Sequence, residues 1–226
     1  MNNKSDYNVL FVDCFDTILY RKISKKQIFK NWTEALSKNV LIDSKTLLKT
    51  YIRTNFWLCF KKVFKKFLLQ EEFEVVIKKM YEKLAKKHQM ISLDKFMEIA
   101  INLYIKEEQK WLGVNYELLD FLKKEKQKGK KIYLVSDFYC SSTILKLWIK
   151  NLKIDDIFDD VFSSASLEKE KANTKMYKHL LKMLDLNKKE VLMMGNNFWS
   201  DVLMARFCGL KTKHIKRNRK NANYNK

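Results

Sequence analysis

Charged and hydroxyl side chains stand where short apolar segments of this sequence end. Asp13 directly follows one apolar run, and Ser136 follows another. Lys171 precedes a helical segment, and Asp201 comes one turn after Gly195. A buried carboxylate is costly unless it has partners or a function. A carboxylate, a hydroxyl, an ammonium and a second carboxylate form a set suited to covalent catalysis on an anionic substrate.

The segments around these residues alternate between strand and helix patterns. The predicted strands are residues 9–12, 131–135, 160–162, 190–194 and 211–215. The predicted helices are residues 116–128, 142–151, 174–184 and 198–208. Because strands joined by single helices form right-handed crossovers, we predict an α/β fold, a doubly wound parallel sheet with helices on both faces. The carboxyl ends of its strands would bring Asp13, Ser136 and the turn after Gly195 to one edge.

Residues 22–114 form a separate segment with helical periodicity. The stretch from Ser24 to Gln27 is typical of a capping box, and Asp43 or Ser44 can cap a second, longer helix. The aromatic residues of that longer helix recur at helical spacing, so we expect them to be core: Phe56, Trp57, Phe60, Phe64 and Phe67. The predicted organisation is an α/β core at residues 1–21 and 115–216, a helical insertion at 22–114 and a basic, flexible tail at 217–226.

The composition fits a folded protein of a reducing compartment. Of the 226 residues, 46% are hydrophobic, and no apolar run approaches the roughly 18–20 residues that span a membrane. Residues 1–6 are polar, and no apolar signal segment follows them. The four cysteines are scattered without a Cys-x-x-Cys pair, which argues against a zinc ribbon. We therefore expect a cytoplasmic protein without a membrane partner.

The net charge of +20 indicates an attraction for anions. The basic residues are mostly lysines spread along the chain, whereas arginine occurs only at positions 21, 53, 206, 217 and 219. Basicity without an arginine-rich motif specifies little about nucleic acid. The composition therefore favours a small anionic substrate over nucleic acid as the partner.

Four motifs, in order along the chain, resemble those of the haloacid dehalogenase superfamily of hydrolases. The first is Val9-Leu-Phe-Val-Asp13-Cys-Phe-Asp16-Thr17, and the second is Leu134-Val-Ser136-Asp137. The third is Lys171-Ala-Asn-Thr-Lys-Met-Tyr177, and the fourth is Met193-Met-Gly195-Asn196-Asn197-Phe-Trp-Ser-Asp201. The resemblance covers residues 9–20 and 115–216. It implies a Rossmann-like core with a helical cap inserted between the first two motifs.

The resemblance implies a role for each matching residue. Asp13 would attack the substrate and form a covalent ester. Thr17 and Ser136 would hold the oxygens of the transferred group. Lys171, or the neighbouring Lys169 in its place, would neutralise charge on the substrate and on the nucleophile. Asp201 would orient that lysine or bind a metal-bound water.

The resemblance also implies a cofactor and a reaction. Mg²⁺ would be held by Asp13, the backbone carbonyl of Phe15, Asn196 and Asp201. Arg21, just past the first motif, and Asn197 are candidate substrate contacts. The implied activity is a phosphatase acting on a small phosphorylated metabolite.

The sequence departs from the phosphatases of this superfamily at two positions. Phe15 stands where they usually carry an acid/base Asp, and Asp16, one residue further on, is the candidate replacement. Asn196 stands where a metal-binding Asp is usual, which weakens an all-oxygen Mg²⁺ site. Phe15, Asn197 and Trp199 resemble instead the metal-independent 2-haloacid dehalogenases. A third hypothesis, a degenerate hydrolase that only binds an anionic partner, also stays open.

Overall fold

The computed structural model of the chain describes residues 7–66 and 71–216, and the predicted basic tail at 217–226 lies outside the described residues. The described residues form two compact units. The α/β unit contains residues 7–20 and 113–216, and the helical unit contains residues 21–66 and 71–112. This division falls close to the predicted limits of the helical insertion. That the helical unit serves as a cap stays a prediction.

The α/β unit is built on a five-stranded sheet in the order β5-β4-β1-β6-β7. Its strands are Val9–Val12 (β1), Lys131–Ser136 (β4), Asp160–Ser163 (β5), Val191–Gly195 (β6) and Lys211–His214 (β7). All neighbouring strands run parallel, with Val12 opposite Leu134 on one side and Met194 on the other. The predicted parallel α/β fold is confirmed. The ends of β1, β4, β5 and β6 therefore share one edge of the sheet.

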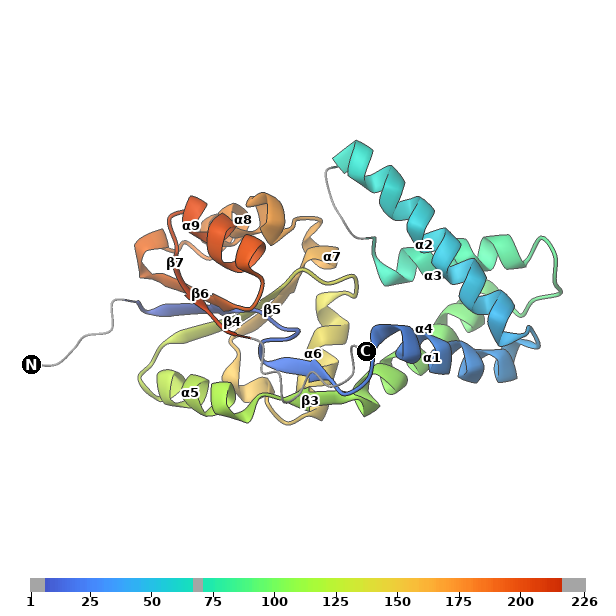
Figure 1. The fold of residues 1–226 in the computed structure, drawn as a ribbon, viewed down its shortest axis with the longest axis horizontal. Helices are drawn as coiled ribbons and strands as arrows, with labels where there is room; N and C mark the ends of the chain where they lie inside the picture. The colour runs from blue at the N-terminus through green and yellow to red at the C-terminus, as the bar shows by residue number, and fades with distance from the viewer. Residues whose placement is uncertain (1–6, 67–70, 217–226) are drawn as a thin grey trace, which may run out of the picture. The chain divides into compact units, whose positions relative to one another are not determined.

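Helices cover both faces of this sheet, as a parallel sheet requires. On one face lie α5 (Tyr116–Gln127) and α6 (Ser142–Asn151), and on the other α8 (Lys175–Met183) and α9 (Met204–Phe207) (Figure 1). A short helix, α7 (Ser164–Leu167), follows β5. Turns of 3₁₀ helix occur at Asp155–Ile157 (η1), Lys171–Asn173 (η2) and Lys188–Glu190 (η3). One core cluster joins sheet and helix residues: Val9, Phe11, Val135, Phe162, Met176, Tyr177, Leu180 and Met193.

The segment predicted as one helix at residues 198–208 has two parts. A π-helix, Phe198–Leu203 (η4), precedes α9. Asn197 is the N-cap of η4. Its side-chain Oδ1 accepts hydrogen bonds from the backbone N–H groups of Trp199 at 3.0 Å and Ser200 at 3.1 Å. Apolar spacing alone does not distinguish this wider turn from an α-helix. Such turns are frequent at functional sites, and η4 carries Asp201.

The structure also contains a two-stranded sheet that the sequence analysis does not predict. It is formed by β2 (Leu19–Arg21) and β3 (Leu112–Val114), at the two points where the chain changes unit. Each strand has three residues, too few for an alternating pattern. Gly113 lets the ring of Tyr20 lie close to the backbone, because a Cβ atom at this position would be 2.4 Å from that ring and would displace it.

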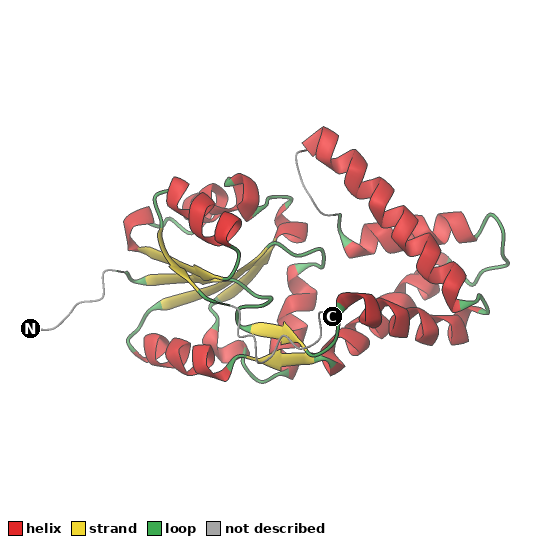
Figure 2. Ribbon diagram, viewed as in Figure 1, coloured by secondary structure: helices red, strands yellow, loops and turns green. Residues whose placement is uncertain are grey.

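The described part of the helical unit consists of α1 (Lys25–Val40), α2 (Ser44–Lys66), α3 (Phe73–Leu84) and α4 (Leu93–Lys110) (Figure 2). Ser24 Oγ accepts a hydrogen bond from the N–H of Gln27 at 3.2 Å, and Asp43 Oδ1 accepts one from that of Thr46 at 2.8 Å. Ser24 is confirmed as an N-cap, and of Asp43 and Ser44 it is Asp43 that caps the second helix. Within the described residues, however, the Gln27 side chain bonds to Asn31 rather than completing a capping box. The core is a cluster of buried rings from all four helices: Phe29, Trp32, Tyr51, Phe73 and Tyr104. Among the described residues, no helix has the length and apolar character needed to cross a membrane.

The prediction that the aromatic stripe of α2 is core is wrong for the side chains that the structure describes. Three of its rings are exposed: Phe56 by 72%, Trp57 by 48% and Phe60 by 55%. The side chains of Phe64 and Phe67 lie outside the described residues. The buried positions of α2 include Leu47, Tyr51 and Thr54. Because apolar residues occur on both sides of α2, helical spacing alone cannot tell which row faces the core.

Candidate active site

Asp13 lies at the carboxyl end of β1, where the strand stops and the chain turns. Its backbone N–H donates to the carbonyl of Met194 on β6 at 2.8 Å, so the neighbouring strand fixes its position. The residue is 7% exposed. Burial raises the pKa of Asp13 to about 6; the charge on Lys171 opposes this shift, and Asp201 adds to it. Asp13 is thus desolvated and still ionised at neutral pH.

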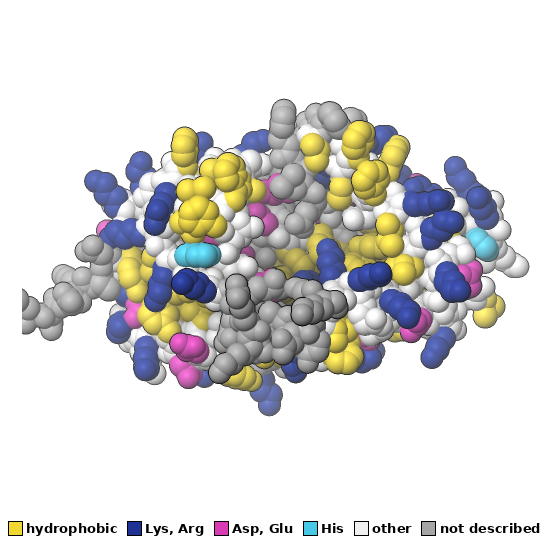
Figure 3. Space-filling view, in the orientation of Figure 1, with side chains coloured by type: hydrophobic (Ala, Val, Ile, Leu, Met, Phe, Trp, Pro, Cys, Tyr) yellow, Lys and Arg dark blue, Asp and Glu magenta, His cyan; other side chains and the backbone are white. Residues whose placement is uncertain are grey.

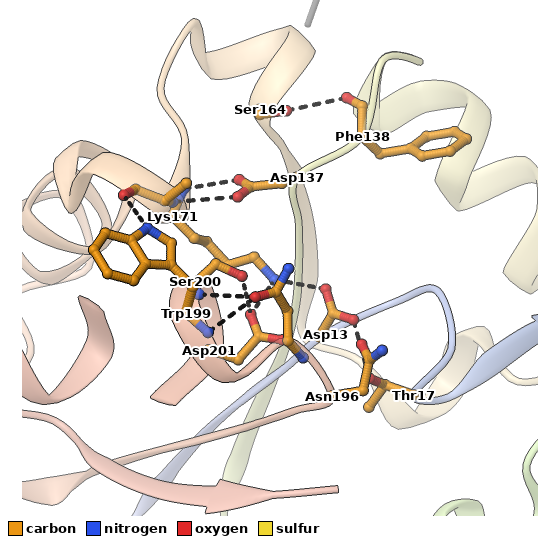
Figure 4. A network of polar contacts seen from close by, with 12 residues as sticks. Asp13, Thr17, Asp137, Phe138, Ser164, Lys171, Asn196, Trp199, Ser200 and Asp201 are labelled. Atoms are coloured by element: carbon orange, nitrogen blue, oxygen red, sulfur yellow. Dashed lines mark hydrogen bonds and ion pairs between the residues drawn. The ribbon is translucent and has the colours of Figure 1, made fainter. Parts of the chain in front are cut away.

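Lys171 lies in η2, ahead of α8, and its side chain is buried. Its Nζ donates to Asp13 Oδ1 at 2.5 Å and to Asp201 Oδ1 at 2.7 Å (Figure 4). Burial disfavours the charge on Lys171, but the attraction of both carboxylates outweighs it and holds the lysine pKa well above its usual value. Lys169 instead donates to the carbonyl of Leu167 at 3.0 Å. Of the two candidate lysines, Lys171 is the one that the fold brings to Asp13.

Asp201 is the second carboxylate on Lys171. Its Oδ2 accepts a hydrogen bond from the backbone N–H of Asn197 at 2.9 Å, and its Oδ1 also accepts one from the hydroxyl of Ser200 at 3.2 Å. Gly195 permits the close approach of this carboxylate to the end of β6, since a Cβ atom there would lie 2.2 Å from Asp201 Oδ2. The glycine of the fourth motif therefore has a steric reason.

Asp137 supports the site in a way that the sequence analysis does not assign. Its two carboxylate oxygens accept hydrogen bonds from the backbone N–H groups of Lys171 at 2.8 Å and Ala172 at 3.3 Å (Figure 4). Burial raises the pKa of Asp137, while the charge of Lys171 and these two hydrogen bonds oppose the rise. Asp137 thus holds the turn that carries the lysine. Its place next to Ser136, at the end of β4, is the signal that could have found it.

Thr17 connects Asp13 to the fourth motif. Its hydroxyl lies 3.0 Å from Asp13 Oδ2 and 3.2 Å from Asn196 Oδ1, so two side-chain oxygens converge on it. Oxygen ligands suit Mg²⁺, which proteins usually hold through one or two carboxylates together with substrate phosphate. The donor type therefore fits this ion, with one carboxylate and one amide. Within the described residues, no group of three or more His, Cys, Asp or Glu side chains could hold a metal.

Ser136 and Asn197, both predicted to contact the substrate, have different surroundings. Ser136 is buried at the end of β4, and its hydroxyl has no hydrogen-bond partner within the described part of the chain. That hydroxyl can therefore serve a ligand. Asn197 is exposed, and its side-chain oxygen is engaged at the start of η4.

The other predicted residues follow the first motif. The ring of Phe15 stacks on Phe138 with the centroids 4.4 Å apart and meets Trp148 edge-on at 6.2 Å. Asp16 is half-buried and has a left-handed backbone with φ of 58°, a conformation that favours glycine. Arg21 lies in the helical unit and forms an ion pair with the buried Glu108. The roles of Asp16 and Arg21 stay predictions.

Comparison with known sequences places these residues in a family. A sequence profile of haloacid dehalogenase-like hydrolases matches residues 7–209. The chain is also 36% identical over 70 residues to the glyceraldehyde 3-phosphate phosphatase of Pyrococcus abyssi. That stretch is 30% of this chain and 29% of the relative, so the matched region spans less than a third of the relative's length.

Comparison with solved structures identifies the same fold. A haloacid dehalogenase-type phosphatase from Thermococcus onnurineus superposes with a TM-score of 0.61 and 16% identity, covering 93% of this chain and 87% of that one. A 2-haloacid dehalogenase from Pseudomonas syringae pv. Tomato DC3000 superposes with a TM-score of 0.66 and 10% identity, covering 91% and 85%. At these identities the likeness shows the fold alone. The profile, however, covers most of the chain, and the predicted family is confirmed: this protein belongs to the haloacid dehalogenase-like hydrolases.

Proposed function

We propose that this hydrolase is a phosphatase, and that it cleaves a small phosphorylated molecule through a phosphoryl group carried on Asp13. The observation that carries the proposal is the buried Nζ of Lys171, bonded to both Asp13 and Asp201. A phosphate ester adds negative charge next to the nucleophile, so attack requires a fixed cation that offsets it. The stretch shared with the phosphatase from Pyrococcus abyssi supports the same choice.

The reaction would proceed in two displacements at phosphorus. A carboxylate oxygen of Asp13 forms a bond to phosphorus while the bond from phosphorus to the ester oxygen breaks, and the alcohol leaves. Water then attacks the phosphorus, inorganic phosphate departs and the Asp13 carboxylate is restored. The hydroxyls of Thr17 and Ser136 would donate hydrogen bonds to the phosphoryl oxygens in both steps.

The departing alkoxide needs a proton, which Phe15 cannot provide. We assign this role to Asp16, three residues after the nucleophile. Substituting Asp16 by Ala should slow hydrolysis of alkyl phosphates far more than that of 4-nitrophenyl phosphate, because nitrophenolate leaves without a proton. Equal slowing of both substrates would remove Asp16 from this role.

Mg²⁺ is the cofactor that the proposal includes. Asp13 and Asn196, whose oxygens converge on Thr17, would hold it together with the carbonyl of Phe15 and with Asp201. When bound, the ion supplies positive charge beside the phosphoryl oxygens. Because an amide replaces one carboxylate, we expect weak binding, and activity that rises with Mg²⁺ up to high concentration.

A second candidate, metal-independent hydrolysis of a carbon–halogen bond, is favoured by the aromatic contacts of Phe15. Its ring is fixed against Phe138 and Trp148, in the place where a phosphatase acid/base would stand. The same Asp13–Lys171 pair would serve a carboxylate nucleophile that displaces halide.

The two candidates are separated by assaying a panel of phosphate monoesters and 2-haloacids with Mg²⁺ and with chelator. We expect release of phosphate, dependence on Mg²⁺ and loss of turnover in Asp13→Asn. Turnover of a phosphate ester that survives this substitution would overturn the covalent mechanism. Halide release that a chelator leaves unchanged would establish the second candidate instead.

A further inference from the structure

A hollow of about 440 Å³ lies within the helical unit. None of the residues that line it belongs to the candidate active site. It is lined by Thr46, Lys49, Thr50 and Arg53 of α2 and by Lys83, Leu84, Lys86, Lys87 and His88 at the end of α3. Its volume falls in the range of about 300–1,000 Å³ that is typical of small-molecule sites. The hollow is therefore large enough for a ligand of metabolite size.

The lining of this hollow is strongly cationic. Five of its nine residues are Lys or Arg, one is His and none is acidic. Thr46, Lys49, Thr50 and Arg53 recur at the three- and four-residue steps that place side chains on one face of a helix. Figure 3 shows that basic side chains outnumber acidic ones on the drawn face of this unit. An anion is the ligand that this lining would recognise.

Neighbouring carboxylates offset the charge of the hollow only in part, through the attraction of Glu82 for Lys86. Asp43 accepts a hydrogen bond from the N–H of Thr46, and Glu82 forms its ion pair with Lys79, 2.7 Å away. Within the described residues, Lys49 and Arg53 form no ion pair with a carboxylate. Their charges are therefore available to an external anion.

The walls of the hollow are held in place. Lys83 Nζ donates to the hydroxyl of the buried Thr54 at 3.0 Å, which ties the end of α3 to α2. The backbone N–H groups of Lys87 and His88 both donate to the carbonyl of Leu84, at 2.9 and 3.0 Å. Leu84 itself is buried. The cations thus project from a fixed frame, which limits the ordering that a ligand must impose.

We propose that this hollow is a binding site for a small soluble anion with two or more linked phosphate groups. Five cations exceed what one phosphate needs, and the threonine hydroxyls can donate to its oxygens. A strand of nucleic acid is disfavoured, because the lining offers no Phe, Tyr or Trp on which bases could stack. The site is independent of the phosphatase proposal, since none of its residues belongs to the Asp13 network.

The test uses inorganic tripolyphosphate as the probe and calorimetry at about 150 mM salt, where long-range attraction is screened. The full-length Asp13→Asn protein serves as the background, so that the probe is not consumed. The test variant is Lys49→Ala with Arg53→Ala. The matched control is Lys26→Ala with Lys30→Ala, which removes two exposed cations at the same spacing from α1. Both variants lower the net charge equally.

We expect the Kd for tripolyphosphate to rise about tenfold or more in the test variant, which corresponds to about 1.4 kcal/mol of binding free energy. In the control variant the Kd should change by less than about twofold. Orthophosphate should bind more weakly than tripolyphosphate. Equal losses in both variants, or no saturable binding, would overturn the site. If single-stranded RNA bound more tightly than tripolyphosphate and lost this affinity in the test variant, the site could not be assigned to a small anion. Circular dichroism of both variants checks that they are folded.

Discussion

The cations that carry the two proposals have opposite surroundings in the two units of this protein. In the α/β unit the ammonium of Lys171 is 1% exposed and fixed between two carboxylates, each within 2.7 Å. The helical unit also contains largely buried ion pairs, Arg21 with Glu108 and Lys62 with Glu71. The cations of its hollow, such as Lys49 and Arg53, are instead exposed. A buried ion pair is costly to assemble but has one geometry, whereas exposed cations stay hydrated and accessible to an anion from solution. The buried arrangement around Lys171 suits catalysis, and the exposed cations of the helical unit suit the binding of an anion.

The largest effect is expected when the buried cation, Lys171, is removed. In Lys171→Met, Asp13 and Asp201 lose their shared partner while the side chain keeps its length. We expect a loss of about 3–5 kcal/mol in the free energy of unfolding at pH 7, because uncompensated carboxylates stay buried. Urea denaturation measures it, with Lys169→Met as the matched control. That control should change stability by less than about 0.5 kcal/mol, because among the described residues the side chain of Lys169 hydrogen-bonds only to the backbone carbonyl of Leu167.

The pH dependence of this loss has a defined sign. Burial already raises the pKa of Asp13 to about 6, above the value of about 3.9 in the unfolded chain, and removing the Lys171 charge that opposes this rise raises it further. The destabilisation therefore grows as the pH rises and the buried Asp13 becomes charged, and it shrinks as the pH falls and Asp13 takes up a proton. A loss that stayed constant from pH 7 to pH 4 would mean that packing, rather than unpaired charge, is responsible.

The next effect concerns the turn that carries the lysine. Asp137→Ala removes the acceptors of the Lys171 and Ala172 N–H groups, so we expect about 1–3 kcal/mol less stability. Asp137→Asn, which keeps one acceptor oxygen, should lose less. If Asp137 positions Lys171, the alanine variant should also show a raised apparent pKa of Asp13 in its activity profile. A stability loss without that shift would make Asp137 a structural residue only.

The ionisation of Asp13 itself predicts a pH profile. A nucleophile must be deprotonated, and burial raises the pKa of Asp13 to about 6. Activity should therefore fall about tenfold for each pH unit below this value, equivalent to about 1.4 kcal/mol. Phosphate monoesters titrate in the same range, so kcat/KM should be measured with two substrates of different phosphate pKa. An inflection that moves with the substrate would not belong to Asp13.

The α/β unit could be predicted from the sequence because its reactive side chains stand at the ends of its predicted strands. Asp13 and Ser136 stand where strands end, and parallel strands bring such ends to one edge. Lys171 could not be separated from Lys169, because both precede the same helix and only the turn geometry selects one. The role of Asp137 was not predicted, because its partners are backbone N–H groups that no sequence pattern identifies, and only its position beside Ser136 at the end of β4 marks it.

The helical unit was less predictable for a physical reason. Helical spacing predicts that α2 exists, and Asp43 predicts where it begins. Apolar residues occur on both of its sides, so the spacing does not predict which side is buried. Tyr51 is buried against Phe29, whereas Phe56, five residues later and on another side of the helix, is exposed. Which row faces the core depends on the other helices, and that information is not local.

This difference within α2 gives the smallest predicted effect. Phe56→Ser should change the free energy of unfolding by less than about 0.5 kcal/mol, because the ring is 72% exposed and little apolar contact is lost. Tyr51→Ala, on the same helix, should cost about 3 kcal/mol or more, because it leaves a cavity among Phe29, Trp32 and Phe73. Urea denaturation of both variants compares the rows directly. A large loss for Phe56→Ser would mean that its ring is buried in the native protein, and the predicted aromatic core of α2 would then be restored.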